Sequence, residues 1–295
     1  MLHAPGFPRS HVESLRLLLL VDDEPGLPGA SLVVEHGFSC WVETDSGRVL
    51  FDAGQGRAVV ANAEQLAVRL EDADAVVLSH GHYDHTGGLA LLPGQLPIRR
   101  VVAHPDFDTS HRGRSAGRDR DIGIPEAAAL ALLRTNVQRR REPSEVIPGV
   151  WATGEIPRVT DEGPGGAFFR DALGHDPDPI VDDQALLVRH ITGLVLLLGC
   201  AHAGVVNSLR YARALFPGEP LIGVVGGMHL RHATSRRIER TAAELAAGST
   251  GIVAPAHCTG DEARRRLMNR MPHRYCHVGV GSSLELDRNG DWRTS

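Results

Sequence analysis

The feature that most constrains this chain is a run of metal-binding residue types, LSHGHYDHTGG at 78–88, directly after a short apolar segment. The preceding DAVVL is typical of a buried strand, so the run begins where a strand ends. Alternate side chains of an extended turn face one way, which lets His80 and His82 hold one ion. Asp84 and His85 follow at the start of the helix that TGGLALL predicts and can face a second ion. We therefore expect a two-metal site nucleated by these four residues.

Histidine and cysteine usage supports metal chemistry over the alternatives. The chain has 16 histidines, several of which stand beside Asp, Gly and Cys at the ends of apolar runs. A lone histidine is usually a surface or capping residue, but four ligand residues at this spacing after a strand favour a metal site. The cysteines form no CxxC pair, so neither a disulfide framework nor a structural zinc knuckle is expected. They are Cys40, Cys200, Cys258 and Cys276.

Apolar segments typical of strands alternate with segments of helical periodicity along most of the chain, which predicts stacked α/β layers. A layered fold of 295 residues can enclose one core, so we expect one domain over 1–295. The Arg/Gly/Asp-rich stretch 109–121 breaks the periodicity and is expected to be a surface loop over the site. Predicted strands are 15–23, 31–44, 47–54, 74–80, 98–103, 150–154, 185–190, 193–199, 221–227 and 251–257; predicted helices are 57–70, 86–92, 125–133, 205–216 and 235–247.

Charge and hydropathy argue against nucleic acid and membrane as binding partners. A formal net charge of -5 lacks the basic character of nucleic-acid-binding proteins, so no nucleic-acid partner is expected. The apolar run 17–21 is too short for a signal core or a membrane span. We expect a cytoplasmic protein without membrane contact that acts on a small molecule, with a phosphorylated molecule as one alternative; its oligomeric state is left open.

Two later strand ends offer further ligands, His202 in GCAH after GLVLLL and His257 in AHCTG after GIVAP. Each is alternatively a histidine satisfied within the fold. His229 ends the strand in GVVGGMHL and could act as an acid or base beside the metals, so Asp84 and His229 are the candidate catalytic residues.

HxHxDH followed by Gly-Gly resembles the signature of the metallo-β-lactamase superfamily, and the order of later strands and histidines agrees over nearly the whole chain. The resemblance implies an αββα four-layer sandwich with the site along one edge of the facing sheets. It also implies that His202 joins His80 and His82 at the first metal, and that His257 joins Asp84 and His85 at the second. Zinc is the expected metal, with iron and manganese as alternatives.

The chain departs from that family at one ligand. Many relatives have an aspartate that bridges both metals just after the strand where GCAH stands here. Three alternatives remain: Asp183 bridges, Cys200 binds metal, or a hydroxide bridges alone. Asp52 in LFDAG resembles the family aspartate that orients ligand histidines, although Asp-x-Gly is also an ordinary turn sequence. Glu155 and His104 are expected to be structural or rim residues.

A finer resemblance concerns one subgroup, the 7,8-dihydropterin-6-yl-methyl-4-(β-D-ribofuranosyl)aminobenzene-5'-phosphate synthase-like proteins. It rests on EHG at 35–37, FDAG, RDIGIP at 120–125, TGEIPR, GCAHAG, GGMHL and AHCTG. It implies a transferase that joins a dihydropterin methyl diphosphate to a ribofuranosylaminobenzene phosphate. Four arginines before DIGIP could clamp phosphate, or could form a solvated basic loop offset by Asp119 and Asp121. They are Arg112, Arg114, Arg118 and Arg120.

Three functions follow. In the first, a hydrolase, a metal-bound hydroxide attacks an ester, phosphoester, thioester or amide, which agrees with the absence of a GxSxG nucleophile. The second is the pterin transferase. The third is a non-catalytic metal-binding or redox-sensing protein, which would have complete coordination without an open position.

Overall fold

The computed structural model describes residues 10–26, 29, 31–92, 100–115, 117–248 and 251–295, in which two mixed sheets pack face to face. The first sheet has the strand order β17-β16-β1-β2-β3-β4-β5-β8, and the second has the order β15-β14-β13-β12-β10-β9. The first sheet consists of β1 (Leu15–Val21), β2 (Ser39–Thr44), β3 (Gly47–Phe51), β4 (Ala75–Val77), β5 (Val101–Ala103), β8 (Val137–Arg139), β16 (Ser283–Leu286) and β17 (Trp292–Thr294). The second consists of β9 (Ser144–Ile147), β10 (Val150–Ala152), β12 (Ala185–His190), β13 (Gly193–Leu198), β14 (Leu221–Gly227) and β15 (Ile252–Ala256).

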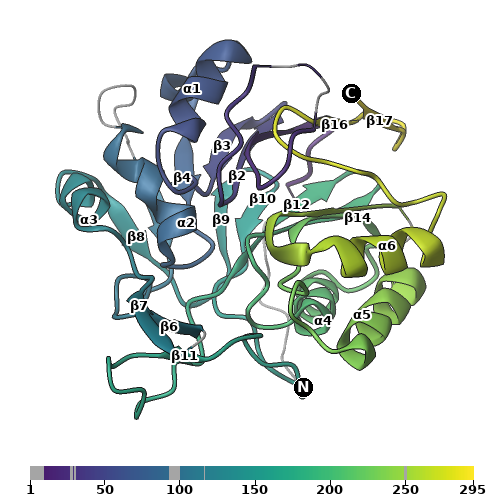
Figure 1. The fold of residues 1–295 in the computed structure, drawn as a ribbon. Coiled ribbons are helices and arrows are strands. Elements are labelled where there is room, and N and C mark those ends of the chain that lie inside the picture. The colour runs from purple at the N-terminus through teal and green to yellow at the C-terminus, as the bar shows by residue number, and fades with distance from the viewer. Residues whose placement is uncertain (1–9, 27–28, 30, 93–99, 116, 249–250) are drawn as a thin grey trace.

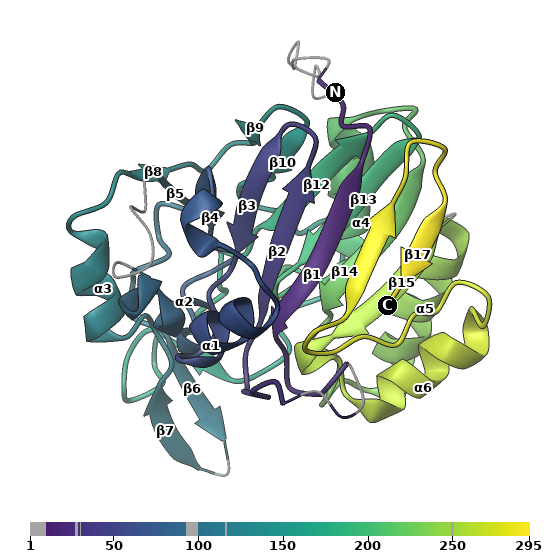
Figure 2. The same cartoon turned by 90° about the horizontal axis from the view of Figure 1, so that it is seen from above.

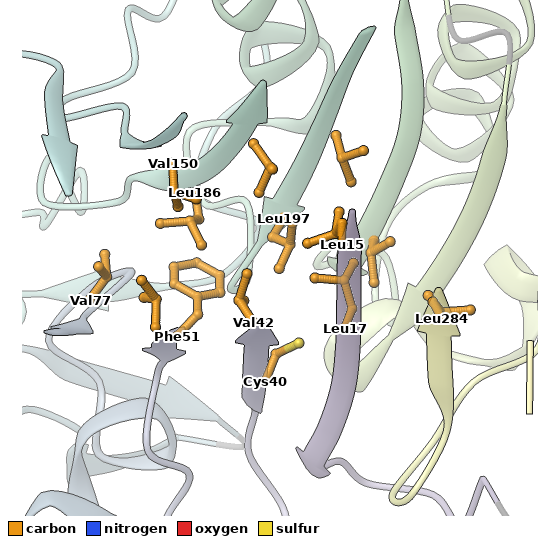
Figure 3. Packing of buried hydrophobic residues seen from close by; sticks show 14 of the residues in the cluster. Leu15, Leu17, Cys40, Val42, Phe51, Val77, Val150, Leu186, Leu197 and Leu284 are labelled. Atoms are coloured by element: carbon orange, nitrogen blue, oxygen red, sulfur yellow. The ribbon is translucent and has the colours of Figure 1, made fainter. Parts of the chain in front are cut away.

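Apolar side chains fill the space between the sheets. Figure 3 shows Leu17, Val42 and Phe51 of the first sheet pointing toward Leu186 and Leu197 of the second. All five are fully buried. Since burying one such side chain contributes roughly 1.5–3 kcal/mol, this apolar layer is the main attraction between the sheets.

Helices cover the outer faces of both sheets (Figure 1). Apolar side chains of α1 (Ala58–Gln65) and α3 (Glu126–Leu132) pack against the first sheet. Those of α4 (Val205–Leu215), α5 (Ser235–Gly248) and α6 (Asp261–Arg270) pack against the second. In α5 the buried positions Ile238, Thr241, Ala242 and Leu245 recur with the helical period, which gives the helix one inward face. The layers therefore run helix, sheet, sheet, helix, as the sequence predicted.

The strand expected over 31–44 is wrong in its first half, because β2 begins only at Ser39. Several amides between residues 33 and 38 bond to side chains or to carbonyls outside any strand; Glu35 donates to the Asp22 carbonyl and Phe38 to the Asp84 carbonyl. Val33 donates to Asn62 Oδ1 at 2.7 Å, and Gly37 donates to Asp23 Oδ1 at 3.2 Å. These bonds hold the segment beside the strand ends.

The surface loop expected over 109–121 is also wrong. It forms an antiparallel hairpin of β6 (Arg112–Ser115) and β7 (Arg118–Asp121), with β11 (Phe168–Phe169) as a third strand. Arg112 lies opposite Asp121 in the register and Arg114 lies opposite Asp119, so opposite charges stabilise a pair of strands that lacks an apolar face. Figure 2 shows the hairpin projecting from the body of the molecule.

Several smaller differences concern element ends. The predicted helix over 57–70 is α1, which ends at Gln65, and the helix after the histidine run begins earlier, as α2 (Tyr83–Thr86) followed by a 3₁₀ turn. The sequence did not predict β8, β9, α6, β16 or β17. Residues 98 and 99 of a predicted strand lie outside the described residues. Among the described helices, none has the length and apolar character that crossing a membrane requires.

The parallel strands place their carboxyl ends along one edge of the sandwich. In the first sheet β3 and β4 are parallel, and in the second β13, β14 and β15 are parallel. The two edges touch, because Gln184 donates its backbone N–H to the Ser79 carbonyl at 2.9 Å and His257 donates its own to Asp22 Oδ2 at 2.8 Å. Side chains that follow these strands are therefore brought together.

Candidate metal centre

Sharp turns at the strand ends direct the site residues inward. Asp52 follows β3, His229 follows β14 and His257 follows β15, and their φ angles are 59°, 46° and 47°. Ala201, between two site residues after β13, has a φ of 57°. A non-glycine residue in this left-handed region costs about 1–3 kcal/mol and is found mainly at functional sites. Tertiary contacts therefore hold the backbone here in a conformation that its own preferences oppose.

The first cluster is formed by His80, His82 and His202. Their ring centroids lie 4.5 Å apart for His80 and His82, 4.8 Å for His80 and His202, and 4.9 Å for His82 and His202. His202 donates Nδ1–H to the Pro164 carbonyl at 2.9 Å, which leaves the lone pair on Nε2. All three Nε2 atoms are buried and have no hydrogen-bond partner among the described residues. Buried imidazole nitrogens without partners fit a metal ion that they would coordinate together.

The second cluster is formed by Asp84, His85 and His257. His85 donates Nδ1–H to Asp52 at 2.7 Å, and His257 donates Nδ1–H to Asp23 at 2.6 Å. Asp84 Oδ2 lies 3.8 Å from His85 Nε2 and 3.4 Å from His257 Nε2. Carboxylates thus orient both rings with Nε2 toward the same point, an arrangement typical of metal-ligating histidines.

Cys200 lies between the two clusters. Its Sγ is 3.2 Å from His85 Nε2, and its ligand atom lies within 4.8 Å of those of His80 and His202 and also of those of His85 and His257. Asp183 does not reach either cluster in this way: its Oδ2 accepts a hydrogen bond of 2.7 Å from the Ala203 N–H beside α4. Of the two side chains considered as bridges, the geometry therefore favours Cys200.

Asp52 is the buried centre of the support beneath the histidines. Besides His85, it accepts the Ser79 N–H and the Ser79 hydroxyl, each at 2.7 Å. Gly199 passes so close that a Cβ there would lie 2.1 Å from Ser79 Oγ, so only glycine fits. The turn residue of LFDAG is thus the orienting aspartate that the family resemblance implied.

Burial and mutual repulsion set the charges of the clusters. Burial, reinforced by the neighbouring His85, holds the pKa of His80 well below its ordinary value, and burial lowers the pKa of His82 to about 3. These rings are neutral, as metal ligands must be. Burial alone would raise the pKa of Asp84, but His85 and His257 outweigh it and hold that pKa well below its ordinary value. The first cluster therefore offers neutral nitrogens. In the second, burial lowers the pKa of His85 and His257, but the neighbouring acidic groups outweigh burial and raise both pKa values above the ordinary one.

Four further residues of the centre were missed in the sequence. Asp23 orients His257, and His36 Nε2 lies 3.3 Å from Asp84 Oδ2. His111 lies with its ring centroid 5.3 Å from that of His82, and Cys258 Sγ is 3.4 Å from Cys200 Sγ. Asp23 is the last residue of the predicted first strand, and its position at a strand end was the available signal. His36 and Cys258 lie in the EHG and AHCTG motifs of the subgroup resemblance, which gave them no role, and nothing local distinguishes His111.

The remaining candidates divide by position. His229 lines the cavity beside the clusters, with its ring centroid 4.4 Å from that of His202 and a buried Nδ1 without a described partner. His104 lies 3.5 Å from Glu155, which pairs with Arg141, and neither lines that cavity. They have the structural role that the sequence suggested.

The cavity at the clusters has a volume of about 180 Å³ and opens beside a larger groove of about 500 Å³. Both are lined by His36, Ile122, Phe168 and His229. We call the first the metal pocket and the second the hairpin groove, because β6 and β7 form one of its walls. A small substrate can therefore extend from the clusters into the groove.

A family model described as "Metallo-beta-lactamase superfamily" matches residues 32–257. A curated protein of Methanocaldococcus jannaschii, named only as uncharacterized protein MJ0448, is 32% identical over 248 residues, which cover 83% of this chain and 92% of the relative. The 7,8-dihydropterin-6-methyl-4-(beta-D-ribofuranosyl)-aminobenzene-5'-phosphate synthase of the same organism is 24% identical over 291 residues, which cover 93% and 98%. The subgroup resemblance seen in the motifs is confirmed by this match.

Among solved structures, that of Tm1679, described as a metal-dependent hydrolase of the beta-lactamase superfamily, matches with a TM-score of 0.74. It is 30% identical and covers 92% of this chain and 98% of its own. The αββα fold predicted from the sequence is confirmed.

Proposed function

The chain belongs to the metallo-β-lactamase superfamily, and from this premise we propose that it is a dinuclear metal-dependent hydrolase of a small molecule. Its substrate would contain an ester, phosphoester, thioester or amide bond. One observation carries the proposal: unpartnered, buried Nε2 atoms from both sheets converge on one pocket that has room beside them. A purely structural metal site is closed, so the open pocket favours catalysis.

Each cluster would hold one divalent ion. His80, His82 and His202 would hold the first, Asp84, His85 and His257 the second, and Cys200 would contact both. Zinc suits imidazole nitrogens together with a sulfur and a carboxylate, while iron and manganese are the alternatives. When bound, such ions polarise the reacting bond and supply an activated water near neutral pH.

The chain's own residues supply orientation and proton transfer. Asp52 and Asp23 fix the ring orientations of His85 and His257, so the ligands need not reorganise during the reaction. His229 lines the pocket at the side of His202 and would exchange a proton with the leaving group.

The second candidate is a transferase of the pterin synthase type. It is favoured by the relative that matches along 93% of this chain and by the arginines of the hairpin groove. In that case the diphosphate leaving group would occupy the metal pocket, at the position that the ester bond would occupy in the hydrolase. The two functions differ in whether the metal-loaded protein consumes water.

Metal content and hydrolysis, measured together, test the proposal. Wild type, His82→Ala and His257→Ala would be analysed by metal mass spectrometry and assayed with phosphodiester and thioester substrates, with exposed His273→Ala as the matched control. We expect about two ions per chain in wild type and control, and loss of metal with hydrolysis in both site variants. Two ions without hydrolysis would favour the transferase. No bound metal after reconstitution would overturn both functions.

A further inference from the structure

The metal pocket holds two thiols in contact, and the proposed function uses only one of them. Cys200 Sγ lies 3.4 Å from Cys258 Sγ, and both side chains line the pocket. Both cysteines are free and buried, with 3% and 7% of their surface exposed. Cys200 follows β13 and Cys258 follows β15, the two neighbours of β14, so the sheet brings together residues that are 58 positions apart.

The backbone around the pair leaves room for the Cys258 thiol next to Cys200. Beyond the end of β14, the His229 N–H donates to Cys258 Sγ at 3.2 Å. Gly227 lies beside the same sulfur, and a Cβ there would lie 2.9 Å from it, so a larger residue would displace the thiol. Cys200 Sγ in turn lies 3.2 Å from His85 Nε2. The two sulfur atoms are therefore held between the end of β14 and the second cluster.

The two thiols differ in their relation to the metal clusters. Cys200 shares groups of mutually close ligand atoms with residues of both clusters. Cys258 shares such a group with Cys200 and His229 and, among the described residues, with no member of either cluster. A thiol that touches a metal-binding thiol, but is not itself needed as a ligand, is free to react with an oxidant and to pass the oxidation to its neighbour.

We infer that Cys200 and Cys258 form an oxidation site, at which hydrogen peroxide joins the two sulfur atoms in a reversible disulfide. The Cys258 sulfur attacks one peroxide oxygen, the O–O bond breaks, and a sulfenic acid forms as water leaves. The Cys200 sulfur then attacks the sulfenic sulfur, and the S–S bond forms as the sulfenic oxygen leaves with the Cys200 proton as a second water. Where Cys200 is bound to metal without its proton, that oxygen leaves as hydroxide. Two sulfur atoms are thereby oxidised and one peroxide is reduced.

The disulfide changes the metal centre. This consequence rests on the proposed function, whereas the pair itself is defined by its two sulfur atoms. Zinc binds a cysteine sulfur as the negatively charged thiolate, and a sulfur atom in a disulfide carries no such charge. Oxidation therefore removes Cys200 from both proposed metal shells and weakens metal binding. A dithiol reductant cleaves the disulfide by exchange and restores the ligand, so the metal occupancy follows the supply of peroxide and reductant.

Treatment of the zinc-loaded protein with hydrogen peroxide tests this inference. Zinc takes no part in redox chemistry, so the thiols are the reductant. Peptide mapping by mass spectrometry should find Cys200 linked to Cys258. The zinc affinity, measured by competition with a chromophoric chelator, should fall at least about tenfold, since even changes to groups that only orient the ligands cost that much. Dithiothreitol should restore the affinity.

Two matched variants locate the effect. Cys258→Ser keeps an acceptor for the His229 N–H but cannot form the disulfide, so it should retain its zinc affinity after peroxide treatment. Cys276→Ser removes a partly buried thiol that does not line the metal pocket, and it should respond to peroxide as wild type does.

Other results contradict the inference. A link of Cys258 to another cysteine, the absence of any link, or zinc loss from Cys258→Ser to the same extent as from wild type would overturn the oxidation site. A mapped disulfide that leaves the zinc affinity unchanged would overturn its effect on the metal centre. The same mapping on metal-free protein separates the two proposals: disulfide formation in a chain that binds no zinc removes the proposed function alone, and zinc-dependent hydrolysis without a disulfide removes the oxidation site alone.

Discussion

At the residue scale, the centre depends on carboxylates that hydrogen-bond to the Nδ1 atoms of its histidines. Asp52 bonds to His85 and twice to Ser79, and Asp23 bonds to His257. Each carboxylate selects the ring tautomer that leaves Nε2 free. The two clusters are therefore preformed before any ion arrives.

Asp52→Asn tests this support. The amide would present an N–H group to His85 or to Ser79 where the carboxylate now accepts, so the His85 ring should lose its fixed orientation. We expect metal affinity to fall roughly 10–100-fold, measured by competition with a chromophoric chelator. Asp287→Asn, in a surface turn, is the matched control and should bind metal as wild type does. Unchanged affinity in Asp52→Asn would show that the ligands orient themselves.

The buried carboxyl group of Asp183, which is not among the proposed metal ligands, should make the stability of the fold depend on pH. Burial raises its pKa from 3.8 to about 7, so the folded protein favours the neutral acid. The folded pKa of Asp183 therefore lies above the unfolded one. The contribution of the neutral acid to the free energy of unfolding is fully present below pH 3.8 and is lost as the pH rises through 7. An asparagine does not titrate and keeps an acceptor for the Ala203 N–H.

Relative to wild type, Asp183→Asn should therefore gain free energy of unfolding between pH 4 and pH 8, by an amount on the order of 4 kcal/mol. Urea denaturation of both proteins across this range measures the difference. Parallel stability curves would contradict the raised pKa. The metal content of the variant should equal that of wild type, and a loss of metal would instead identify Asp183 as a ligand.

At the element scale, the close approach of β13 and β4 at their carboxyl ends brings ligands from both sheets to one place. Gly199 allows this approach, because the space that a side chain would need is occupied by Ser79 Oγ. The turn also sets the positions of Cys200 and His202, which follow at once. Strand packing and metal geometry are thus coupled through one glycine.

Gly199→Ala should accordingly destabilise the fold by about 1–3 kcal/mol and lower metal content, because the methyl group must push β13 away from Ser79. Gly56→Ala is the control, since a Cβ there meets Glu35 at 3.7 Å, an ordinary contact. Chemical denaturation and metal analysis of both variants measure the two effects. Full metal content in a destabilised Gly199→Ala protein would show that the metal site does not depend on the packing of β13 against Ser79.

At the scale of the whole molecule, the centre joins the two sheets of the sandwich. His80, His82, Asp84 and His85 come from the first sheet, while His202 and His257 follow strands of the second. Ions held as proposed between them would add a link to the apolar layer seen in Figure 3. Such ions bind the folded state alone and so stabilise it by mass action.

Metal removal should therefore lower the thermal midpoint. At an ion concentration of 100 times Kd the stabilisation is about 2.7 kcal/mol per ion, which corresponds to roughly 4 °C per ion for a chain of this size. Calorimetry with and without a chelator, followed by addition of excess zinc, measures the shift and its reversal. If complete metal removal left the midpoint unchanged, the ions would not link the sheets.

The sequence by itself determined the layered fold, most strands and helices, and the local part of the centre. It did so because His80, His82, Asp84 and His85 lie within six residues after one strand, where short-range geometry places their side chains. The hairpin of 112–121 was missed, since its charged residues lack the apolar alternation that identifies strands.

Only the tertiary structure decided which distant residues complete the centre. Asp23, His36 and Cys258 reach it from segments far apart in the chain, and Asp183 Oδ2 accepts the Ala203 N–H although its sequence position allowed a bridge. The arginines were visible in the sequence, but only the folded hairpin pairs Arg112 with Asp119 and places Arg118 and Arg120 on one face of β7. Local patterns specify elements and contiguous ligands, whereas contacts between remote strand ends exist only once the two sheets have packed.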